Sequence, residues 1–356
     1  MKKVQKALNY TKKNQISILV RLLLSLIVVA GFLLVFFLCD GVGYFRYSNI
    51  VSAASEDKLQ VHFVDVGQGD ATIICLPSDK IMLVDTGESY ESDKLTTYMS
   101  QLMNLTGHYV IDFLVLTHPD ADHVGGTEEI AKQFEIDKVY RPKLLCQSEE
   151  ESLASTGYDV AETQTYDKAI TSLYDQQAEM IFSQSGISFN EGGAQIEFLA
   201  PIDERYSNTN NYSAVIKMTY QGKSFLLTGD CEQMVEKQLL QSGQNLDCDV
   251  LKVSHHGSNN ASSTEFLRAV TPTYACISVG ENSYGLPNKQ AIERLQEVCS
   301  QIYLTSQQGS YCISVGQNNL LAVNFVDERL DFTIIILIAG VGLILIWGIK
   351  LPKRKR

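Results

Sequence analysis

Residues 116–126 read Leu116-Thr117-His118-Pro119-Asp120-Ala121-Asp122-His123-Val124-Gly125-Gly126. Two imidazoles and two carboxylates therefore fall within six residues, directly after the apolar run 113–116. Imidazole and carboxylate groups at this spacing are typical of metal ligands on a loop that follows a strand. The segment predicts a metal site at one edge of a sheet.

Further polar residues lie before and after the segment 116–126, and each of them follows a strand-like apolar run. Asp85 precedes the segment, and Asp230 and the pair His255-His256 follow it. A divalent ion held by such residues lowers the pKa of bound water and neutralises charge on a scissile oxygen. We predict six metal ligands, with Asp230 as a carboxylate that can bridge two ions: His118, Asp120, Asp122, His123, Asp230 and His256.

The other candidate residues surround these ligands. Neighbouring side chains diverge, so one residue of the pair His255-His256 is expected to bind metal. We favour His256, which leaves His255 to contact either substrate or a metal ligand. Asp85 is expected to orient a metal-bound histidine. Lys252 is expected to meet either a phosphate or solvent. Asp122, His255 and Lys252 are the predicted catalytic residues, and those expected to support the ligands or contact substrate are Asp65, Gln68, Asp70, Asp85, Asn211, Ser213, Ser258 and Asn282.

The chain resembles a metallo-β-lactamase-fold hydrolase, and specifically the extracellular hydrolase domain of the ComEC family of DNA-uptake proteins. The resemblance covers about residues 59–325. It depends on these stretches: Phe63-Val64-Asp65-Val66-Gly67-Gln68-Gly69-Asp70-Ala71, Val84-Asp85-Thr86-Gly87, Thr117 to His123, Asn211-Tyr212-Ser213, Leu227-Thr228-Gly229-Asp230, Lys252-Val253-Ser254-His255-His256-Gly257-Ser258 and Ser278-Val279-Gly280-Glu281-Asn282.

The resemblance implies an α/β fold, a four-layer αββα sandwich with the metal site at one edge, and phosphodiester hydrolysis of DNA. Asp120 stands where the wider fold commonly has histidine, and no histidine occurs between His123 and Asp230. An oxygen-rich ligand set for one or two divalent ions favours manganese, with magnesium or zinc as alternatives. Leu286 stands where the family usually has a histidine, and the chain is expected to lack the family's polytopic channel domain.

Two uncharged segments of 18 residues, at 22–39 and 332–349, have the length of membrane-spanning helices. Basic tails at 1–21 and 350–356 flank them, which predicts that both termini are cytoplasmic. Residues 40–57 form a tether, and the hydrolase domain at 58–327 is expected on the outer side of a cell membrane. The alternative for 22–39 is a cleaved signal peptide, with 51–54 as the processing site.

The net charge of the part between the two predicted spans limits which substrates it can bind. The part between the two spans holds 18 basic and 41 acidic residues, a formal net charge of −23. Such a field repels polyanions, so single-stranded DNA would need metal ions or a local basic patch to bind. A small cell-envelope phosphoester, or an amide, is the second hypothesis, and a non-catalytic binding protein is the third. A separate DNA-uptake channel is a further expected partner.

Strand-like and helix-like stretches alternate through the external part. Strands are predicted at 61–66, 73–76, 81–84, 113–116, 195–199, 214–218 and 224–227, and helices at 92–105 and 232–240. Two similar halves indicate layered sheets that are covered by helices. The acidic segment 147–190 is expected to be an insertion, either a lid over the site or a solvated surface excursion.

Overall fold

The computed structural model describes residues 59–316 and 319–326, together with 18–27 and the isolated positions 2, 5, 15, 30 and 31. The chain divides into a unit of Tyr47–Glu328 and a second unit of Met1–Arg46 with Arg329–Arg356. The predicted span 332–349, the tail 350–356, the tether 40–57 and most of 1–39 lie outside the described residues. Within the described residues, none of the helices has both the length and the apolar character that crossing a membrane requires.

Two sheets form the centre of the Tyr47–Glu328 unit. The eight-stranded sheet has the order β15 (Leu321–Phe325), β14 (Tyr311–Val315), β1 (Leu59–Phe63), β2 (Thr72–Cys75), β3 (Ile81–Val84), β4 (Val110–Val115), β5 (Glu135–Arg141) and β6 (Glu179–Phe182). The seven-stranded sheet has the order β13 (Gln301–Leu304), β12 (Tyr274–Ile277), β11 (Val250–Lys252), β10 (Lys223–Leu227), β9 (Val215–Tyr220), β8 (Ala194–Ala200) and β7 (Ser188–Glu191).

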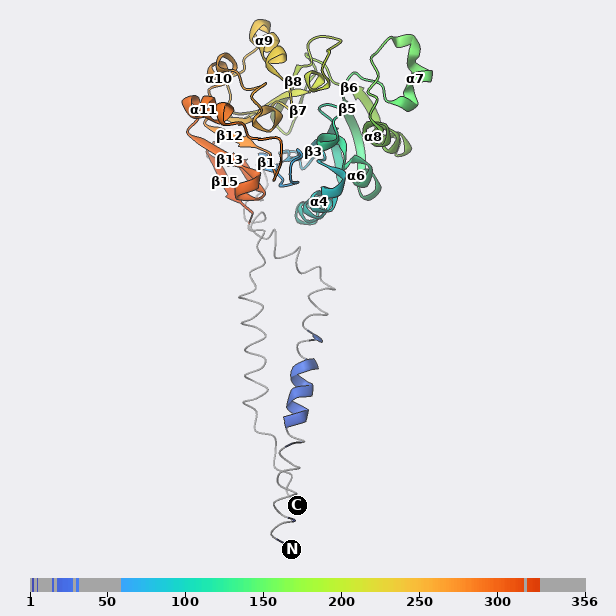
Figure 1. Ribbon diagram of the computed structural model, residues 1–356, viewed down its shortest axis with the longest axis vertical. Coiled ribbons are helices and arrows are strands. Elements are labelled where there is room, and N and C mark those ends of the chain that lie inside the picture. The colour runs from blue at the N-terminus through green and yellow to red at the C-terminus, as the bar shows by residue number, and fades with distance from the viewer. Residues whose placement is uncertain are drawn as a thin grey trace. The chain divides into compact units, whose positions relative to one another are not determined.

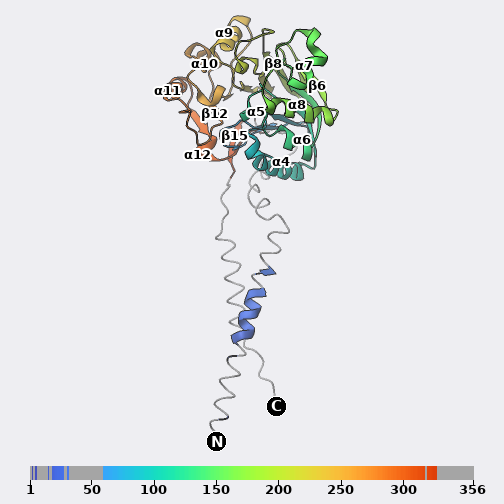
Figure 2. The ribbon, with the colours of Figure 1, turned by 45° about the vertical axis from the view of Figure 1, so that its right-hand side comes forward.

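Helices cover the outer face of each sheet (Figures 1 and 2). On the eight-stranded sheet lie α4 (Ser92–Thr106), α6 (Thr127–Gln133) and α8 (Gln164–Asp175), and on the other lie α9 (Gln233–Ser242), α10 (Thr264–Val270) and α11 (Lys289–Val298). Shorter helices fill the connections: η1 (Ser89–Glu91), α5 (Ala121–Val124), α7 (Gln147–Leu153), η2 (Ala154–Thr156), η3 (Thr209–Tyr212), η4 (Ser254–Gly257) and α12 (Thr305–Gln308).

Apolar side chains separate the four layers. One buried cluster joins the inner faces of both sheets and includes Phe63, Phe113, Phe198 and Phe225. A second cluster lies between the sheets and their helices. Strands such as β3 are buried on both faces, so their sequences read as continuous apolar runs. The predicted αββα sandwich is confirmed.

The strand directions place the predicted ligands together. Strands β3 to β6 are parallel, and so are β10 to β13. Asp85 directly follows β3, His118 comes soon after β4, and Asp230 and His256 follow β10 and β11. Side chains at the carboxyl ends of parallel strands meet at one edge of a sheet, where open α/β sheets bind their ligands.

The prediction that 147–190 is an insertion is wrong. This segment supplies β6 and β7, the edge strands of the two sheets, and helix α8. Helix α8 buries Tyr166, Ile170 and Leu173 against the core, and the side chain of Thr163 caps its first turn. Most of the segment therefore belongs to the sandwich. Its acidic residues gave a misleading signal because Asp175 and Glu179 are exposed at the ends of α8 and β6, while Glu149 is buried in an ion pair with Arg141.

Candidate metal centre

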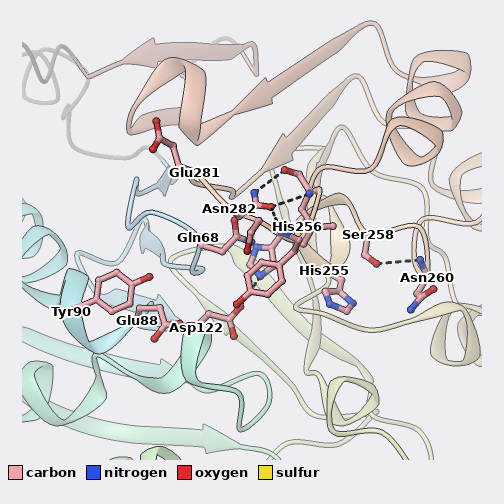
Figure 3. Close-up of a pocket in the computed structure, with 13 residues that line it drawn as sticks. Gln68, Glu88, Tyr90, Asp122, His255, His256, Ser258, Asn260, Glu281 and Asn282 are labelled. Carbon is pink, nitrogen blue, oxygen red and sulfur yellow. Dashed lines mark hydrogen bonds and ion pairs between the residues drawn. The ribbon is translucent and has the colours of Figure 1, made fainter.

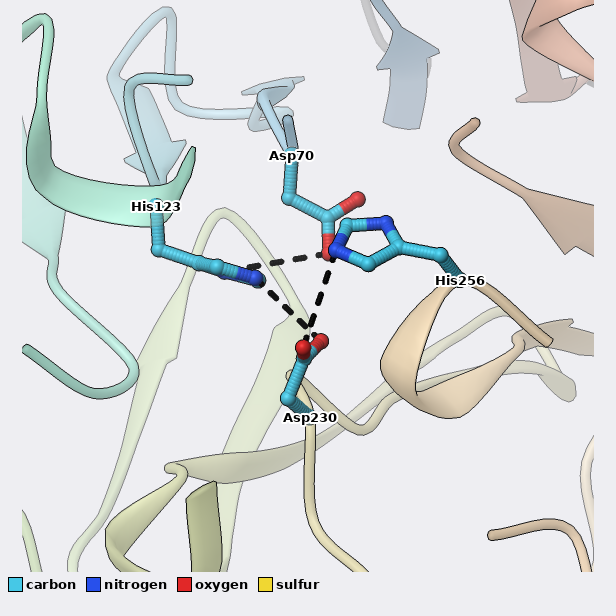
Figure 4. Close-up of side chains that lie close together, drawn as sticks. All are labelled: Asp70, His123, Asp230 and His256. Atoms are coloured by element: carbon cyan, nitrogen blue, oxygen red, sulfur yellow. Dashed lines mark ion pairs between the residues drawn. The ribbon is translucent and has the colours of Figure 1, made fainter. Parts of the chain in front are cut away.

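Four buried residues from four connections converge at the edge of the sheets: Asp70, His123, Asp230 and His256 (Figure 4). Each offers one nitrogen or oxygen atom, and these atoms all lie within 4.8 Å of one another. His123 Nε2 lies 3.2 Å from Asp230 Oδ1, and His256 Nε2 lies 3.6 Å from Asp230 Oδ2. Imidazole nitrogens and carboxylate oxygens at this separation can bind a single divalent ion.

The hydrogen bonds of the histidines fix which nitrogen faces the cluster. His123 Nδ1 lies 2.7 Å from Asp85 Oδ2, and Thr117 donates to both oxygens of Asp85. His256 Nδ1 donates to the carbonyl oxygen of Ser278 at 2.8 Å. Metal-binding histidines characteristically donate the second ring N–H to a carboxylate or a carbonyl. Both Nε2 atoms are therefore left as acceptors that face the cluster.

Unpartnered polar atoms gather at the same place. Among the described residues, the buried side-chain atoms that lack a hydrogen-bond partner include Nε2 of His118, His123 and His256 and Oδ1 of Asp70 and Asp230. A buried polar atom without a partner costs on the order of 1–3 kcal/mol. A bound cation would give partners to the unpartnered atoms of His123, His256 and Asp230, so the donor set fits a divalent metal.

The electrostatics of the cluster point the same way. Burial lowers the pKa of His123, but the negative charges of Asp230 and Asp85 outweigh it and raise that pKa well above the usual value. Burial raises the pKa of Asp230, but the imidazoles of His123 and His256 hold it well below its usual range. Carboxylates thus dominate the field in a buried site, and such a field favours a cation.

Backbone strain is concentrated around the cluster. Asp85, His255 and His256 adopt φ values of +59°, +51° and +51°, which non-glycine residues rarely occupy. Each such residue costs on the order of 1–3 kcal/mol and persists where the surrounding structure requires it. At His255 and His256 the left-handed turn of η4 directs one ring into the cluster and the other toward a pocket.

The remaining predicted ligands adjoin the cluster. His118 is fully buried, its ring centroid lies 4.1 Å from that of His123, and its Nε2 lies 3.7 Å from Asp120 Oδ2. Asp122 Oδ2 lies 3.2 Å from His256 Nε2. Burial raises the pKa of Asp122, but His256 and His123 outweigh it and hold that pKa below its usual range. His118 and Asp120 therefore form a second group of donors beside the first.

Asp70 and Lys252 differ from their predicted placement. Asp70 lies inside the cluster, although the sequence predicted only that it supports the ligands or contacts substrate. Its Oδ2 is paired with the ammonium group of Lys252. The prediction that Lys252 meets a phosphate or solvent is wrong, because its side chain is buried beneath the cluster and ion-paired there.

A cavity of about 640 Å³ opens beside the cluster, and Asp122 and His256 form part of its wall (Figure 3). His255 lines it, with Nε2 at 3.8 Å from Asp230 Oδ2, as do Ser258 and Gln68. The Gln68 side chain also accepts from the backbone N–H of Gly280 at 3.3 Å. These residues are placed where substrate would contact them.

Asn282 and Leu286 line the same cavity. Asn282 Nδ2 donates to the carbonyl oxygens of Gly280 and Leu286 at 3.0 and 2.8 Å, and Asn282 Oδ1 accepts from the N–H groups of Tyr284 and Leu286. Asn282 therefore holds the 282–286 turn. Leu286, in the position where the resemblance leads one to expect histidine, brings no ionisable group to the cavity.

Three of the predicted supporting residues form hydrogen bonds within the loops. Asp65 Oδ1 accepts from the N–H of Gly67 at 3.1 Å, and Asn211 Oδ1 accepts from the N–H of Glu232 at 3.1 Å. Ser213 Oγ accepts from the N–H of Asp230 at 3.0 Å. Asp65, Asn211 and Ser213 do not line the described cavity, so they are placed to position the loops.

Several residues that line the cavity were not predicted from the sequence, among them Glu88, Tyr90 and Tyr284. Glu88 and Tyr90 lie at the η1 turn that follows Asp85, only a few residues beyond a predicted site residue. Tyr284 lies in the turn that Asn282 holds. Proximity in sequence to Asp85 and Asn282 is the only signal that points to them.

Comparison with known proteins agrees with this architecture. Residues 64–281 match the family described as the metallo-beta-lactamase superfamily, and the chain belongs to that superfamily. It is similar to ComE operon protein 3 of Bacillus subtilis (27% identity, 70% of this chain and 32% of that protein) and to competence protein ComA of Neisseria gonorrhoeae (27%, 76% and 34%). Recombination protein 2 of Haemophilus influenzae is 28% identical over 78% of this chain and 30% of its own length. These relatives match the resemblance to the ComEC family, and the chain spans about a third of their length.

Proposed function

We propose that this protein is a membrane-anchored, metal-dependent phosphodiesterase that hydrolyses DNA on the outer side of the membrane. One observation carries the proposal: unpartnered imidazole and carboxylate atoms converge in a buried cluster that opens through Asp122 and His256 into a cavity of about 640 Å³. A buried ligand set beside an open cavity is the arrangement that metal-dependent hydrolysis needs.

The residues divide into two groups by position. His123, Asp230, His256 and Asp70 would hold the main ion, and Asp122 is placed to join them. His118 and Asp120 lie beside His123 and would hold a second ion, with Asp230 as a carboxylate that both ions could share. Carboxylate oxygens are prominent in this set, which favours manganese.

When bound, a divalent ion supplies Lewis-acid stabilisation of the phosphoryl oxygens and lowers the pKa of water. The protein's own residues fix the geometry. Asp85 orients His123, the Ser278 carbonyl orients His256, and Ser213 holds the backbone of Asp230. His255 lies at the cavity wall, 24% exposed, where it is placed to exchange a proton with substrate or leaving group.

Support for DNA as substrate comes from the relatives of Neisseria gonorrhoeae and Haemophilus influenzae, whose names refer to competence and to recombination. A small cell-envelope phosphoester is the second candidate, because no lysine or arginine is among the residues that line the described cavity. Anchoring by the segments 22–39 and 332–349, with both termini cytoplasmic, is proposed from their apolar composition and basic flanks. A separate DNA-uptake channel protein is a further proposed partner.

Hydrolysis of labelled single-stranded DNA by the full-length protein in detergent tests the proposal. We expect cleavage with manganese, none with a chelator, and a loss of at least about 100-fold in Asp122→Asn, since even the residues behind metal ligands contribute 10–100-fold. Asp137→Asn, at an exposed position on β5, is the matched control and should cleave like the parent. Cleavage of a small phosphodiester but not of DNA would favour the second candidate, and equal rates in Asp122→Asn and the parent would refute the proposal.

A further inference from the structure

The cavity beside the cluster is lined by acidic side chains, which is unusual for a site that acts on a polyanion. Its walls carry the carboxylates of Glu88, Asp122 and Glu281, and none of the residues that line it in the described part of the chain is a lysine or arginine. Lys252, the nearest basic residue in the predicted site, is buried and paired with Asp70. A phosphate chain in this cavity would therefore meet no cationic side chain, and binding beyond the metal must come from uncharged groups.

Two tyrosines supply such groups. Tyr90 is 71% exposed and Tyr284 is 78% exposed, and both line the cavity. Tyr90 lies next to Glu88 on the wall that also presents Asp122 (Figure 3). Burial and then the negative charges of Glu88, Glu91 and Tyr284 raise the pKa of Tyr90, so the phenol stays neutral and Tyr284 lies within electrostatic reach.

The backbone beneath each ring is held, although the rings themselves are exposed. Ser92 Oγ donates to the Ser89 carbonyl at 2.8 Å, and the Glu91 N–H donates to the Glu88 carbonyl at 3.0 Å, which fixes the η1 turn under Tyr90. Asn282 fixes the turn that carries Tyr284. Exposed aromatic rings on ordered turns lose little conformational freedom when a flat partner binds.

We propose that Tyr90 and Tyr284 stack on an unpaired base of the strand whose phosphodiester lies at the metal cluster, so that the site takes single-stranded nucleic acid. The inference rests on the proposed function and adds the substrate class. Stacking of a base on an aromatic side chain tolerates any base and does not need positive charge. The amide and hydroxyl groups of Gln68, Asn260 and Ser283 in the same cavity can hydrogen-bond to base edges. Duplex DNA is excluded because its base faces are already stacked.

Binding to two oligonucleotides of equal length and charge tests this inference. One is a thymidine 20-mer, and the other is a 20-mer that lacks bases. Fluorescence anisotropy is measured with manganese on the full-length Asp122→Asn protein, so that both stay intact. We expect the thymidine strand to bind about five- to 150-fold more tightly. Tyr90→Ala and Tyr284→Ala should each remove most of that difference, and Tyr90→Phe and Tyr284→Phe should keep it.

Tyr109→Ala is the matched control, since Tyr109 is 58% exposed and does not line the described cavity. Equal affinity for the thymidine strand and the strand without bases would overturn the inference. So would an unchanged preference for the thymidine strand in both alanine variants, or a duplex of the same length that binds as tightly as the thymidine strand or more tightly. Binding of a chitin oligosaccharide in place of the thymidine strand would overturn it too. If the parent cleaves DNA with manganese and lacks the base preference, only this inference fails; if it cleaves no DNA, the proposed function fails.

Discussion

Asp70 has two roles at the scale of the single residue. One carboxylate oxygen, Oδ2, is paired with the ammonium group of Lys252 and lies 3.8 Å from His123 Nδ1, and the other, Oδ1, is buried without a hydrogen-bond partner. Burial raises the pKa of Asp70, but Lys252 and the imidazoles of His256 and His123 outweigh it, so the carboxyl group stays ionised. The pair fixes the orientation of Asp70 and neutralises part of the negative charge beneath the cluster.

Removing one member of this pair should be costly. We expect Asp70→Asn to lower the free energy of unfolding by about 3–5 kcal/mol, because the Lys252 ammonium stays buried without its partner. The double variant Asp70→Asn with Lys252→Met should recover part of this loss. Urea unfolding in the presence of a chelator measures the free energy of unfolding of Asp70→Asn, of Lys252→Met and of the double variant. Additive losses from the two single variants would show that the pair does not couple.

The sequence predicts some of these residues and not others, for physical reasons. Asp122, His123, Asp230 and His256 stand out because polar residues follow apolar strand-like runs. The pairing of Lys252 with Asp70 joins positions that are 182 residues apart, and it depends on the register of two different sheets. No local pattern carries that information.

At the scale of elements, the loops around the cluster approach one another so closely that only glycine fits at certain points. A Cβ atom on Gly69 would lie 2.5 Å from the carbonyl oxygen of Asp122, and one on Gly280 would lie 2.5 Å from the Gly67 backbone. The Asp70 N–H donates to the same Asp122 oxygen at 2.9 Å. The loop after β1 and the start of α5 are therefore locked together.

We expect Gly69→Ala to separate these two loops and to lower hydrolysis by up to about 100-fold, because small displacements of reacting groups have effects of that size. Gly316→Ala is the matched control, since a Cβ atom there meets only the Leu320 carbonyl oxygen at 3.8 Å. Rate measurements on both variants test the idea. A Gly69→Ala protein as active as Gly316→Ala would show that the close approach is not needed for function.

Several elements were predictable and one large region was not. The predicted strand at 81–84 coincides with β3, and the predicted helix at 92–105 nearly coincides with α4. Buried parallel strands have unbroken apolar sequences, which makes them easy to find. Strands β6 and β7 lie at sheet edges and are only partly buried, so their mixed sequences resembled a loop.

At the scale of the whole molecule, stability depends on pH through a histidine remote from the cluster. His62 is fully buried in β1, with Nδ1 2.9 Å from Tyr98 Oη and Nε2 3.1 Å from Gln60 Oε1. Burial lowers the pKa of His62 to about 3. Below pH 6.5 the unfolded chain binds a proton that the native state does not, so this residue destabilises the native state progressively as pH falls toward 3.

We expect the parent to lose about 2 kcal/mol more unfolding free energy than His62→Gln between pH 7 and pH 5. Above pH 6.5, His62 is neutral in both states and contributes no slope. Urea unfolding at several pH values, with a chelator present, gives the comparison. Identical pH profiles for the two proteins would mean that His62 is not kept neutral by burial.

The most direct test of the central claim is a manganese titration of the full-length protein, followed by calorimetry and by thermal unfolding. A metal at the cluster predicts at least one ion per chain and a stabilisation of about 2.7 kcal/mol at 100 times the dissociation constant. His256→Ala should lose both effects. A parent protein that binds no ion, with an unfolding midpoint that manganese does not change, would contradict the claim.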